Sequence, residues 1–416
     1  MRIAIVGAGI SGLVAARLLA EDHQVVVFES NDYPGGHTNT VDVPRREGRY
    51  AVDTGFIVFN ERTYPNFIKL LRKLGVAWQD STMSFSVKCG RTGVEFSPST
   101  FRSLFAQPGN LLRSSFHRML ADVFRFRRDS EKLLRDNNEE VTLEDYLRRN
   151  RYSKGFMDWF IIPMGAAIWS TDPGRFRRFP ARYFTGFFKN HGILQLRNQP
   201  RWLVVRGGSK QYVAPLTRPF RKDIRLSCPV ASIRRNDDHV EVTPQGEPPE
   251  KFDHVIIATH SDQALSILAD PGEAERRVLG AIPYQPNQAV LHTDHSVLPR
   301  RRAAWASWNY YIPPLETDRV VLTYDMNRLQ SLEAPVRFCV TLNDPGIVAP
   351  QTVVRKILYH HPLYTPEGLE ARKNWKAISG VRRTHYCGAY WGYGFHEDGV
   401  KSALSVCRFF GKSLES

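Results

Sequence analysis

The sequence predicts an α/β protein in which a Rossmann-like nucleotide-binding domain, assembled from discontinuous segments, is joined to an α+β substrate domain. Three observations support this fold class. The first thirty residues alternate strand, glycine turn, helix and strand; strand and glycine patterns return near residues 201 and 384; and the intervening stretch is basic and aromatic. A chain of 416 residues with 42% hydrophobic content is also long enough for two packed domains.

The nucleotide-binding pattern lies at the start of the chain. Residues 2–6 form a short apolar run, and Gly7, Gly9 and Gly12 follow it at GxGxxG spacing, directly before a helix-forming stretch. Gly7 permits a tight turn, and Gly12 lets the helix sit close to the strand. Gly9 allows a pyrophosphate to approach the positive end of the helix, where Ile10 and Ser11 lie. These residues therefore predict a dinucleotide site.

A second strand and an acid complete this unit. Residues 24–28 are apolar and β-branched, and Glu29 follows them about twenty residues after the glycines. A carboxylate at this place binds both hydroxyls of an adenosine ribose and repels a 2′-phosphate. The alternative is a tight βα turn without a ligand.

The remaining segments divide the chain between the two predicted domains. Gly35 and Gly36 let the backbone pass close to a second part of the same ligand, and Gly55 lies at a strand end. We expect an amphipathic helix over residues 64–74 and a hairpin over residues 223–243. The expected nucleotide-binding domain comprises residues 1–77, 201–268 and 375–416, and the expected substrate domain comprises residues 78–200 and 269–374.

Composition excludes several classes of protein. No uninterrupted apolar run reaches the roughly 18 residues that a membrane span requires. The five cysteines are scattered and form no CxxC pair, which fits a reducing compartment and neither a disulfide framework nor a metal site. No leader segment precedes the first strand, so we expect a cytoplasmic protein.

The positive charge is concentrated in one part of the chain. Residues 99–222 contain 24 lysines and arginines against 10 acids, so this stretch holds 14 of the 15 net positive charges. Within it, phenylalanine and leucine recur at helical spacing among Arg125, Arg127 and Arg128. Such a helix binds an anionic membrane surface, or it is simply a solvated basic face. Nothing resembles a nucleic-acid recognition module, so we expect no nucleic-acid partner.

The spread of glycine patterns favours FAD over a nicotinamide cofactor. A nicotinamide enzyme needs one nucleotide-binding unit, whereas glycine patterns here extend to Gly388, which suits a cofactor lying across distant segments. We expect a final helix beginning near Asp398 and Gly399 whose free amides stabilise negative charge on the flavin ring. Because no second GxGxxG is present, electrons are expected to leave to oxygen, quinone or a protein acceptor.

These motifs resemble the amine-oxidase-like FAD superfamily, which includes protoporphyrinogen oxidases and carotenoid desaturases. The resemblance rests on GAGISG with Glu29, YPGGHTNT, the strand at Val230 and the CG…DGVKSA terminus. It implies an FAD-binding domain of the amine oxidase and glutathione reductase type. It also implies that the cofactor contacts His37, Thr54, Val230, Gly388, Asp398 and Val400.

A closer resemblance is to the flavoprotein module fused to plant cyclopropane fatty acid synthases and to its stand-alone bacterial relatives. FNERTYPNF, AAWASWNYY and GYGFHEDG are the most specific shared blocks. The resemblance implies FAD-dependent oxidation or desaturation of an unsaturated or methylated fatty acyl chain on a phospholipid. It also implies a synthase-like methyltransferase as a partner. From the basic stretch described above, we expect a peripheral position at the inner face of the membrane.

Two departures from the superfamily bear on mechanism. Amine oxidases carry a lysine on a substrate-domain strand beside the flavin, and we expect Gln288 at that place. The superfamily also has an acid after the terminal-strand glycine, whereas Ala389 follows Gly388 here, so Glu397 or Asp398 is expected to substitute. The first departure weakens the amine oxidase interpretation.

Desaturation requires a hydride acceptor and a proton acceptor. The flavin-facing loop offers His396, Glu397, Tyr390 and Tyr393, of which His396 has the most suitable ordinary pKa. The alternatives are a histidine that orders the loop, a glutamate that caps a helix and aromatic side chains that pack in the core. Residues 155–169, GFMDWFIIPMGAAIW, line an acyl tunnel or form a buried core loop. Two other functions stay open: an oxidase of soluble amines, and a flavin-bound scaffold that delivers lipid to a methyltransferase.

Overall fold

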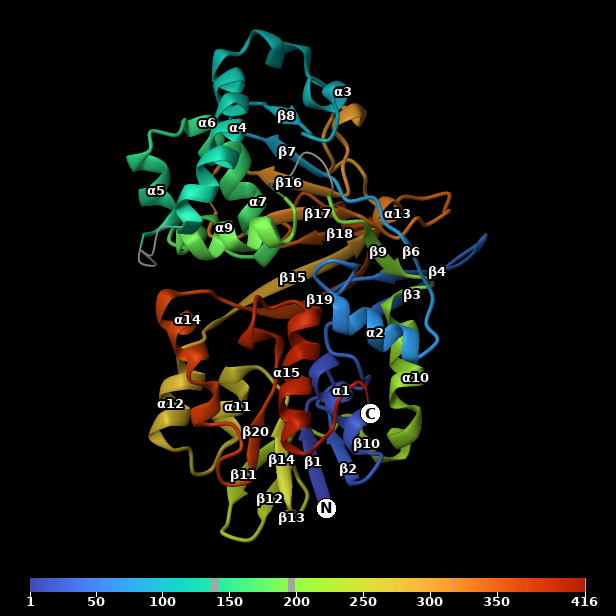
Figure 1. Ribbon diagram of the computed structural model, residues 1–416. Coiled ribbons are helices and arrows are strands. Elements are labelled where there is room, and N and C mark those ends of the chain that lie inside the picture. Colours follow the sequence, from blue (N-terminus) through green and yellow to red (C-terminus); the bar gives the residue numbers. More distant parts are fainter. Residues whose placement is uncertain (136–140, 194–198, 316, 416) are drawn as a thin grey trace.

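The computed structural model describes residues 1–135, 141–193, 199–315 and 317–415, which form two lobes lying one above the other in Figure 1. The lower lobe is built around a five-stranded parallel sheet with the order β10-β2-β1-β14-β20. Its strands come from four distant parts of the chain: β1 (Arg2–Val6), β2 (Gln24–Phe28), β10 (Ile224–Arg225), β14 (His254–Ile257) and β20 (Thr384–Tyr386).

Alternation along β1 explains why this sheet is covered on both faces. Ile3 and Ile5 belong to one core cluster, and Ala4 and Val6 belong to another, because successive side chains of a strand point to opposite faces. Helices cover the first face: α1 (Ile10–Leu19), α2 (Pro65–Lys73), α10 (Val213–Thr217) and α15 (His396–Phe409). The second face is covered by the antiparallel sheet β11 (Val230–Arg235), β12 (Val240–Pro244) and β13 (Glu250–Phe252), and by α11 (Ser261–Ile267) and α12 (Glu273–Gly280).

The upper lobe contains a seven-stranded mixed sheet with the order β19-β15-β18-β17-β16-β7-β8. Most neighbours are antiparallel, and β7 and β16 are parallel. The strands are β7 (Phe85–Cys89), β8 (Glu95–Phe96), β15 (Tyr284–His292), β16 (Trp308–Ile312), β17 (Val321–Asp325), β18 (Cys339–Leu342) and β19 (Val353–Pro362). Figure 1 shows β15 and β19 at the boundary between the lobes, so this edge of the sheet faces the lower lobe.

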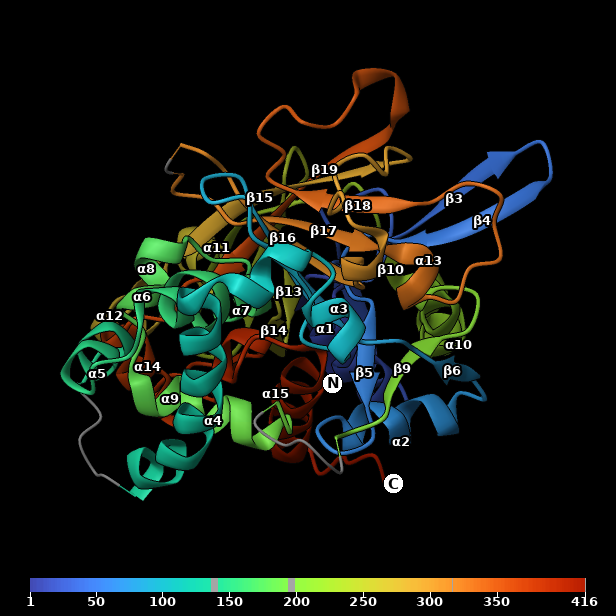
Figure 2. The ribbon, with the colours of Figure 1, turned by 90° about the horizontal axis from the view of Figure 1, so that it is seen from above.

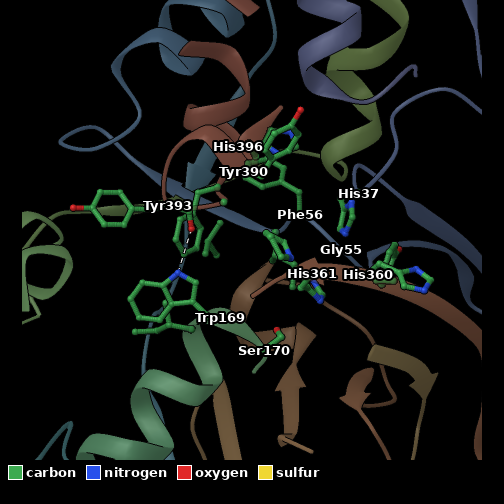
Figure 3. A pocket seen from close by; sticks show the side chains of 18 of the residues that line it. His37, Gly55, Phe56, Trp169, Ser170, His360, His361, Tyr390, Tyr393 and His396 are labelled. Carbon is green, nitrogen blue, oxygen red and sulfur yellow. Dashed lines mark hydrogen bonds between the residues drawn. The ribbon is translucent and has the colours of Figure 1, made fainter. Parts of the chain in front are cut away.

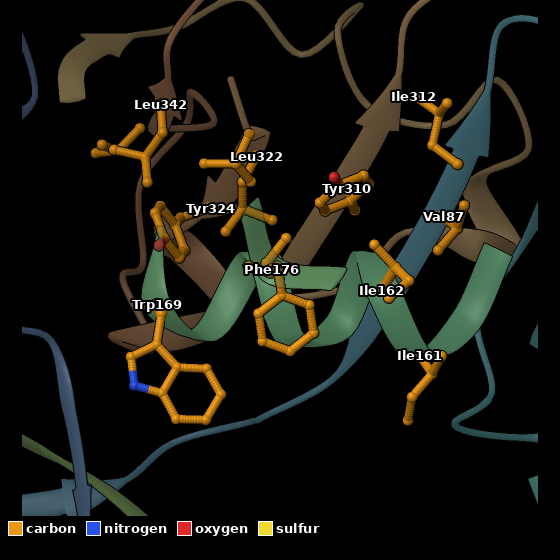
Figure 4. Packing of buried hydrophobic residues seen from close by; sticks show 14 of the residues in the cluster. Val87, Ile161, Ile162, Trp169, Phe176, Tyr310, Ile312, Leu322, Tyr324 and Leu342 are labelled. Atoms are coloured by element: carbon orange, nitrogen blue, oxygen red, sulfur yellow. The ribbon is translucent and has the colours of Figure 1, made fainter. Parts of the chain in front are cut away.

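A group of helices packs against the upper sheet. Figure 4 shows α7 (Ile162–Trp169) across the strands, with Ile162, Phe176 and Trp169 packed beside Tyr324 and Tyr310. A side chain at Gly165 would meet the Phe176 ring at 1.9 Å, so the helix needs glycine to lie this close. The group comprises α3 (Phe101–Leu104), α4 (Ser114–Arg135), α5 (Leu143–Arg149), α6 (Lys154–Phe156), a π-helical turn (Met157–Ile161), α7, α8 (Pro173–Arg177) and α9 (Ala181–Asn190).

Smaller elements connect the lobes. The hairpin β3 (Thr40–Arg45) and β4 (Gly48–Asp53) projects from the molecule in Figure 2. A three-stranded sheet joins β5 (Val58–Asn60), β9 (Trp202–Val205) and β6 (Trp78–Asp80). The remaining helices are α13 (Met326–Leu329) and α14 (Pro366–Lys373), with short 3₁₀ turns at Pro108–Leu112, Ser209–Tyr212, Arg218–Asp223, Arg302–Ala304, Pro350–Thr352, Trp375–Ala377 and Ala389–Trp391.

Three local expectations are corrected. Residues 224–225 pair with β2 in the parallel sheet, so the hairpin begins at Val230 and not at residue 223. Residues 155–169 are helical rather than a loop. The final helix begins at His396, because the Asp398 carboxylate accepts the backbone N–H of Phe395 and fixes the cap there.

Within the described ranges, no helix combines the length and the apolarity that crossing a bilayer would require. All five cysteines are free thiols, and four of them are buried.

Candidate active site

A single cavity of about 1510 Å³ extends from the glycine turn of the lower lobe into the helical group of the upper lobe. Pockets for drug-sized ligands occupy roughly 300–1,000 Å³. The cavity is therefore large enough for an extended dinucleotide together with a second molecule. We call the part at residues 7–11 and 29–32 the nucleotide end, and the part lined by α4 and α7 the apolar branch.

The nucleotide end is formed by the glycine turn and the start of α1. Gly7, Gly9, Ile10 and Ser11 line it, and a side chain at Gly9 would meet nothing within 4 Å, so the backbone is open to the cavity here. No side chain caps the first turn of α1. The free N–H groups at this helix end suit a phosphate, as the spacing predicts.

Gly12 and Glu29 have different roles at this end. Gly12 is not on the cavity wall; a side chain there would meet the Gly7 carbonyl oxygen at 1.9 Å, so its smallness allows α1 to pack on the turn. Glu29 is on the wall at the end of β2, and its carboxylate accepts the backbone N–H groups of Ala8 (2.7 Å) and Asn31 (2.9 Å). This carboxylate is held where a ribose is expected.

The middle of the cavity is lined by backbone rather than by bulky side chains. Gly35, Gly36 and Gly55 all face it, with Val230 and Gly388 further along. A side chain at Gly55 would meet the carbonyl oxygen of His37 at 2.3 Å. A flat ring and its polar chain can pass through such a trough because no side chain fills it.

Histidines gather beside this trough (Figure 3). The ring of His37 stacks on Tyr359 with centroids 4.9 Å apart, and it lies 5.4 Å from the ring of His361 and 6.2 Å from that of His260. Burial lowers the pKa of His37 and of His260 to about 4 and that of His361 to about 3. These imidazoles are neutral at pH 7.

His396 lies on the cavity wall at the first residue of α15. Its ring stacks on Phe56 with centroids 3.6 Å apart, and Nε2 is 2.7 Å from the Tyr212 hydroxyl and 3.1 Å from the Thr38 hydroxyl. Burial lowers the pKa of His396 well below its ordinary value. The ring is neutral and tightly held, which favours an orienting role over free proton exchange.

The two acids after His396 act as helix caps and are not on the cavity wall. The Glu397 carboxylate accepts the backbone N–H of Asn66 (3.2 Å) and of Phe67 (2.9 Å) and the Asn66 side-chain amide (2.6 Å), so it caps α2. Asp398 accepts the backbone N–H groups of Tyr393 (3.0 Å) and Phe395 (3.1 Å), and burial raises its pKa to about 6. This placement argues against Glu397 as a base and against Asp398 as a direct cofactor ligand.

Two further predicted cofactor residues lie behind the wall. Val400 is fully buried in the core beneath α15. The Thr54 hydroxyl donates to the Asn39 carbonyl and receives the Tyr359 hydroxyl, both at 2.9 Å. Thr54 therefore supports Tyr359 rather than facing the cavity.

Tyr390 and Tyr393 both line the cavity near the N-terminus of α15. Tyr390 packs against Gly388, where a side chain would meet the tyrosine ring at 2.3 Å. The Tyr393 ring lies 4.8 Å from Tyr183 and 5.3 Å from Phe187, and the Trp169 indole donates to the Tyr393 carbonyl at 3.2 Å. These rings line the cavity as an aromatic wall and also pack on one another.

The apolar branch continues from this aromatic wall into the helical group. Residues 155–169 supply part of it, so this segment lines the cavity as one of the two alternatives expected. The branch is lined by Met83, Phe85, Phe96, Leu104, Met119, Leu120, Val123, Phe124, Phe160, Ile161, Met164, Ile168 and Phe188, with Arg127 at the α4 side.

Gln288 does not lie beside the cavity. It is exposed on β15, and the neighbouring strand β19 instead presents Ile357, Tyr359 and His361 to the cavity. These residues are not among those that the sequence predicts, and neither is His191, whose Nδ1 donates to the Phe187 carbonyl at 3.0 Å on the cavity wall. Residues 353–362, VVRKILYHHP, carry no motif and no regular alternation that would mark an inward face.

The family model for flavin containing amine oxidoreductases matches residues 10–333. The chain belongs to this family. L-amino acid oxidase Bs29 from Bothriechis schlegelii is 24% identical over 326 residues, and the matched region is 70% of this chain but only 59% of that protein. Two solved structures have the same fold over nearly their whole length. A putrescine oxidase variant has a TM-score of 0.69 at 15% identity, with 99% of each chain covered, and a fatty acid isomerase from P. acnes has a TM-score of 0.69 at 16% identity, with 98% of each covered.

FAD is the cofactor of this family, and the residues present fit it. The uncapped α1 terminus, the Glu29 carboxylate and the glycine trough at Gly36 and Gly55 match the pyrophosphate, ribose and ring parts of an extended FAD. Among the described residues, no group of three or more histidines, cysteines or acids is arranged to hold a metal ion.

Proposed function

We propose that the protein is an FAD-dependent oxidoreductase that oxidises or desaturates an unsaturated or methylated fatty acyl chain of a phospholipid. The observation that supports this proposal is the apolar branch. It is continuous with the rest of the cavity, and its lining includes Met164 on α7 and Leu104 on α3. We also propose the domain division given above, corrected for α12 (Glu273–Gly280), which packs on the parallel sheet of the lower lobe and so belongs with the nucleotide-binding domain. We further propose a kinship with the flavoprotein module of cyclopropane fatty acid synthases. A synthase-like methyltransferase would then supply the modified acyl chain.

The distribution of acids supports an uncharged substrate. Among the described residues of the cavity wall, the acidic side chains are Glu29 and Asp32, and both belong to the nucleotide end. An ammonium group in the apolar branch would therefore be desolvated without a carboxylate partner, at a cost of several kcal/mol. An acyl chain has no such cost.

Oxidation of a soluble amine is the second candidate function. Trp169 and Phe187, with ring centroids 4.6 Å apart, form with Tyr393 an aromatic wall near the flavin end, and such walls attract cations. Family membership also supports this candidate. This second function requires a charged amine to reach the aromatic wall through the apolar branch.

In the proposed reaction, the chain's residues orient the substrate and accept a proton. FAD, when bound, would supply the acceptor for the hydride that desaturation removes from one carbon, with oxygen, quinone or a protein as the final electron acceptor. The proton of the adjacent carbon passes to a base of the chain, and a double bond forms between the two carbons. The apolar branch excludes water and holds the chain extended against the aromatic wall.

We propose His191 as the proton acceptor, with His396, Tyr390 and Tyr393 positioning the reacting carbons. A carbonyl oxygen can only accept, so the contact with Phe187 places the proton of His191 on Nδ1 and leaves a lone pair on Nε2. Burial lowers the pKa of His191 to about 4, so the ring is unprotonated at pH 7, as a base must be, but it is a weaker base than an exposed histidine. The proposal therefore rests on the lone pair of Nε2 and on the place of His191 on the cavity wall. We expect His191→Gln to slow flavin reduction at least tenfold. The assignment would be reversed if flavin reduction is lost in His396→Ala and retained in His191→Gln.

Anaerobic mixing of the FAD-loaded protein with vesicles tests the function. We expect vesicles of methylated or unsaturated acyl phospholipid to bleach the flavin absorbance, and putrescine or L-amino acids to leave it unchanged. Bleaching by amines alone would establish the second candidate. Tight lipid binding with no bleaching by any lipid would instead support a scaffold that delivers lipid to a methyltransferase.

We further propose that the acyl chain enters from an anionic membrane surface at α3 and α4. Phe101, Leu112 and Phe124 are 76%, 92% and 60% exposed, and Phe124 also lines the apolar branch beside Arg127. Apolar side chains flanked by arginines suit the boundary between headgroups and acyl chains. Arg125 is excluded from this role because it pairs with Asp122 and stacks on Tyr152.

Vesicle sedimentation tests this surface. Leu112→Ser with Phe124→Ser should weaken binding to anionic vesicles at least tenfold, whereas Leu315→Ser, an equally exposed leucine elsewhere, should not change it. Equal binding by the double variant and the control would remove the membrane assignment.

A further inference from the structure

A series of hydrogen-bonded polar side chains, called here the Asn343–Asn287 chain, crosses the upper sheet and ends at His361. Asn343 follows β18, Asn287 lies on β15 and His361 lies on β19, so three adjacent strands contribute one residue each. The Gln288 backbone N–H is 3.1 Å from Asn343 Oδ1, Asn343 Nδ2 is 2.7 Å from Asn287 Oδ1, and Asn287 Nδ2 is 2.9 Å from His361 Nδ1.

The direction of every hydrogen bond in this chain follows from its first member. A backbone N–H can only donate, so the Asn343 atom facing Gln288 must be its oxygen, and the Asn343 amide nitrogen then donates to Asn287. The same nitrogen also donates to the Val320 carbonyl at 3.0 Å, which confirms this orientation of Asn343. Asn287 therefore turns its own amide nitrogen toward His361.

This donation fixes the tautomer of His361. Because Asn287 donates to Nδ1, that nitrogen holds the lone pair and the ring proton is on Nε2. Asn287 is fully buried, so water cannot substitute for it. His361 lines the cavity, and Figure 3 shows it beside Gly55 and Phe56, across from His37.

The surroundings keep His361 uncharged. The titratable groups around it include His37 from the glycine trough, His260 at the start of α11 and His360 from its own strand, while β15 contributes the uncharged Asn287. Burial, with repulsion from His37 and His360, lowers the pKa of His361 to about 3. The cavity therefore faces a neutral imidazole.

We infer that His361 is a positioning residue whose Nε2–H, fixed by the Asn343–Asn287 chain, donates a hydrogen bond to an acceptor atom of the flavin ring beside Gly55. The ring occupies this part of the trough if FAD lies extended from Glu29 past Gly36 toward the N-terminus of α15. A donor at this place stabilises the electron-rich reduced cofactor more than the oxidised one. His361 thus raises the midpoint potential of the bound flavin, which favours electron transfer from a weakly activated carbon.

The tautomer can be observed without cofactor or substrate. ¹⁵N-histidine labelling of the FAD-free protein, with the His361 signals assigned by their loss in His361→Gln, distinguishes a protonated from an unprotonated Nδ1. We expect a neutral ring protonated at Nε2 from pH 6 to 8. Asn287→Asp is nearly isosteric, and its ionised carboxylate can only accept a hydrogen bond, so this variant should move the proton to Nδ1.

The second readout is the midpoint potential of the bound flavin, measured by equilibration with redox dyes and without lipid. His361→Leu should weaken binding of reduced relative to oxidised FAD at least tenfold, which lowers the potential by about 30 mV for a two-electron couple. His361→Gln, which retains an N–H donor, should lose less. His295→Leu is the control, because His295 is exposed and outside the cavity.

The proposal is overturned if Nδ1 is protonated in the unmodified protein, or if the His361→Leu potential matches that of the control. If His361→Leu does not retain FAD, two measurements still test the proposal. These are the midpoint potential of His361→Gln, compared with that of the control, and the protonation state of Nδ1 in the labelled FAD-free protein. None of these measurements uses an acyl substrate, so their outcome is independent of whether the proposed function holds.

Discussion

Replacement of Glu397 separates a structural from a catalytic role for the acid that follows His396. In Glu397→Ala, two backbone N–H groups of α2, at Asn66 and Phe67, lose their acceptor, and Phe67 is fully buried. Loss of a helix cap costs about 0.5–2 kcal/mol, and a stranded buried donor costs about 1–3 kcal/mol. We therefore expect the free energy of unfolding to fall by about 3 kcal/mol, a large part of the roughly 5–15 kcal/mol typical of a domain.

Urea unfolding followed by circular dichroism measures this loss. Glu397→Gln keeps the shape and one acceptor oxygen but not the charge, so we expect about half of the effect. Glu367→Gln, in the exposed first turn of α14, is the matched control and should change stability by less than about 0.5 kcal/mol. The rate of reduction per bound flavin should be unchanged in Glu397→Gln. Unaltered stability together with a lost rate of reduction would make Glu397 the base and refute the capping argument.

Three further predictions follow from the cavity and its buried groups. Ile168→Trp, which fills the apolar branch, should slow reduction by acyl lipid at least tenfold, while FAD affinity, measured by fluorescence titration, stays unchanged. Val354→Trp is the control, because Val354 is exposed on β19 and outside the cavity wall. Equal slowing by both variants would contradict the branch as the substrate site. Glu29→Gln should weaken FAD binding at least tenfold in the same titration, and unchanged affinity would place the ribose elsewhere. The free energy of unfolding, measured with urea, should fall from pH 7 to pH 5. Folding lowers the pKa values of several buried histidines, so the unfolded chain binds more protons than the folded chain below pH 6.5. These histidines are His37, His191, His254, His260, His292, His361, His385 and His396. Burial raises the pKa values of Asp53 and Asp398 to about 6, so these two carboxyls stabilise the folded chain on acidification and oppose the larger effect of the histidines. A urea midpoint that rises from pH 7 to pH 5 would show that the carboxyls dominate.

Sequence periodicity was sufficient for the nucleotide-binding unit. The boundaries of β1 and β2 match the expected residues 2–6 and 24–28, because fully buried parallel strands are continuous apolar runs that end sharply at glycine or at an acid. The glycine positions also follow from local geometry: Gly12 and Gly55 are needed where one backbone segment approaches another. These constraints act over a few residues and so are visible in the sequence.

Contacts between distant segments were not predictable in the same way. Gln288 was expected at the flavin, but the neighbouring strand β19 supplies the inward residues, and no local pattern reveals which of two paired strands faces a cavity. Glu397 was expected beside its own helix start or at the substrate, yet it caps α2, more than 300 residues earlier in the chain. Likewise, the tautomer of His361 depends on Asn287 and Asn343, which only strand pairing brings together.

A crystal structure of the protein with FAD and a long-chain acyl phospholipid tests the central claim most directly. The account predicts FAD extended from Glu29 to the N-terminus of α15, with the acyl chain in the apolar branch between α4 and α7 and its reacting carbons against Tyr393. An acyl chain bound outside this cavity, or a flavin ring occupying the apolar branch itself, would contradict the account.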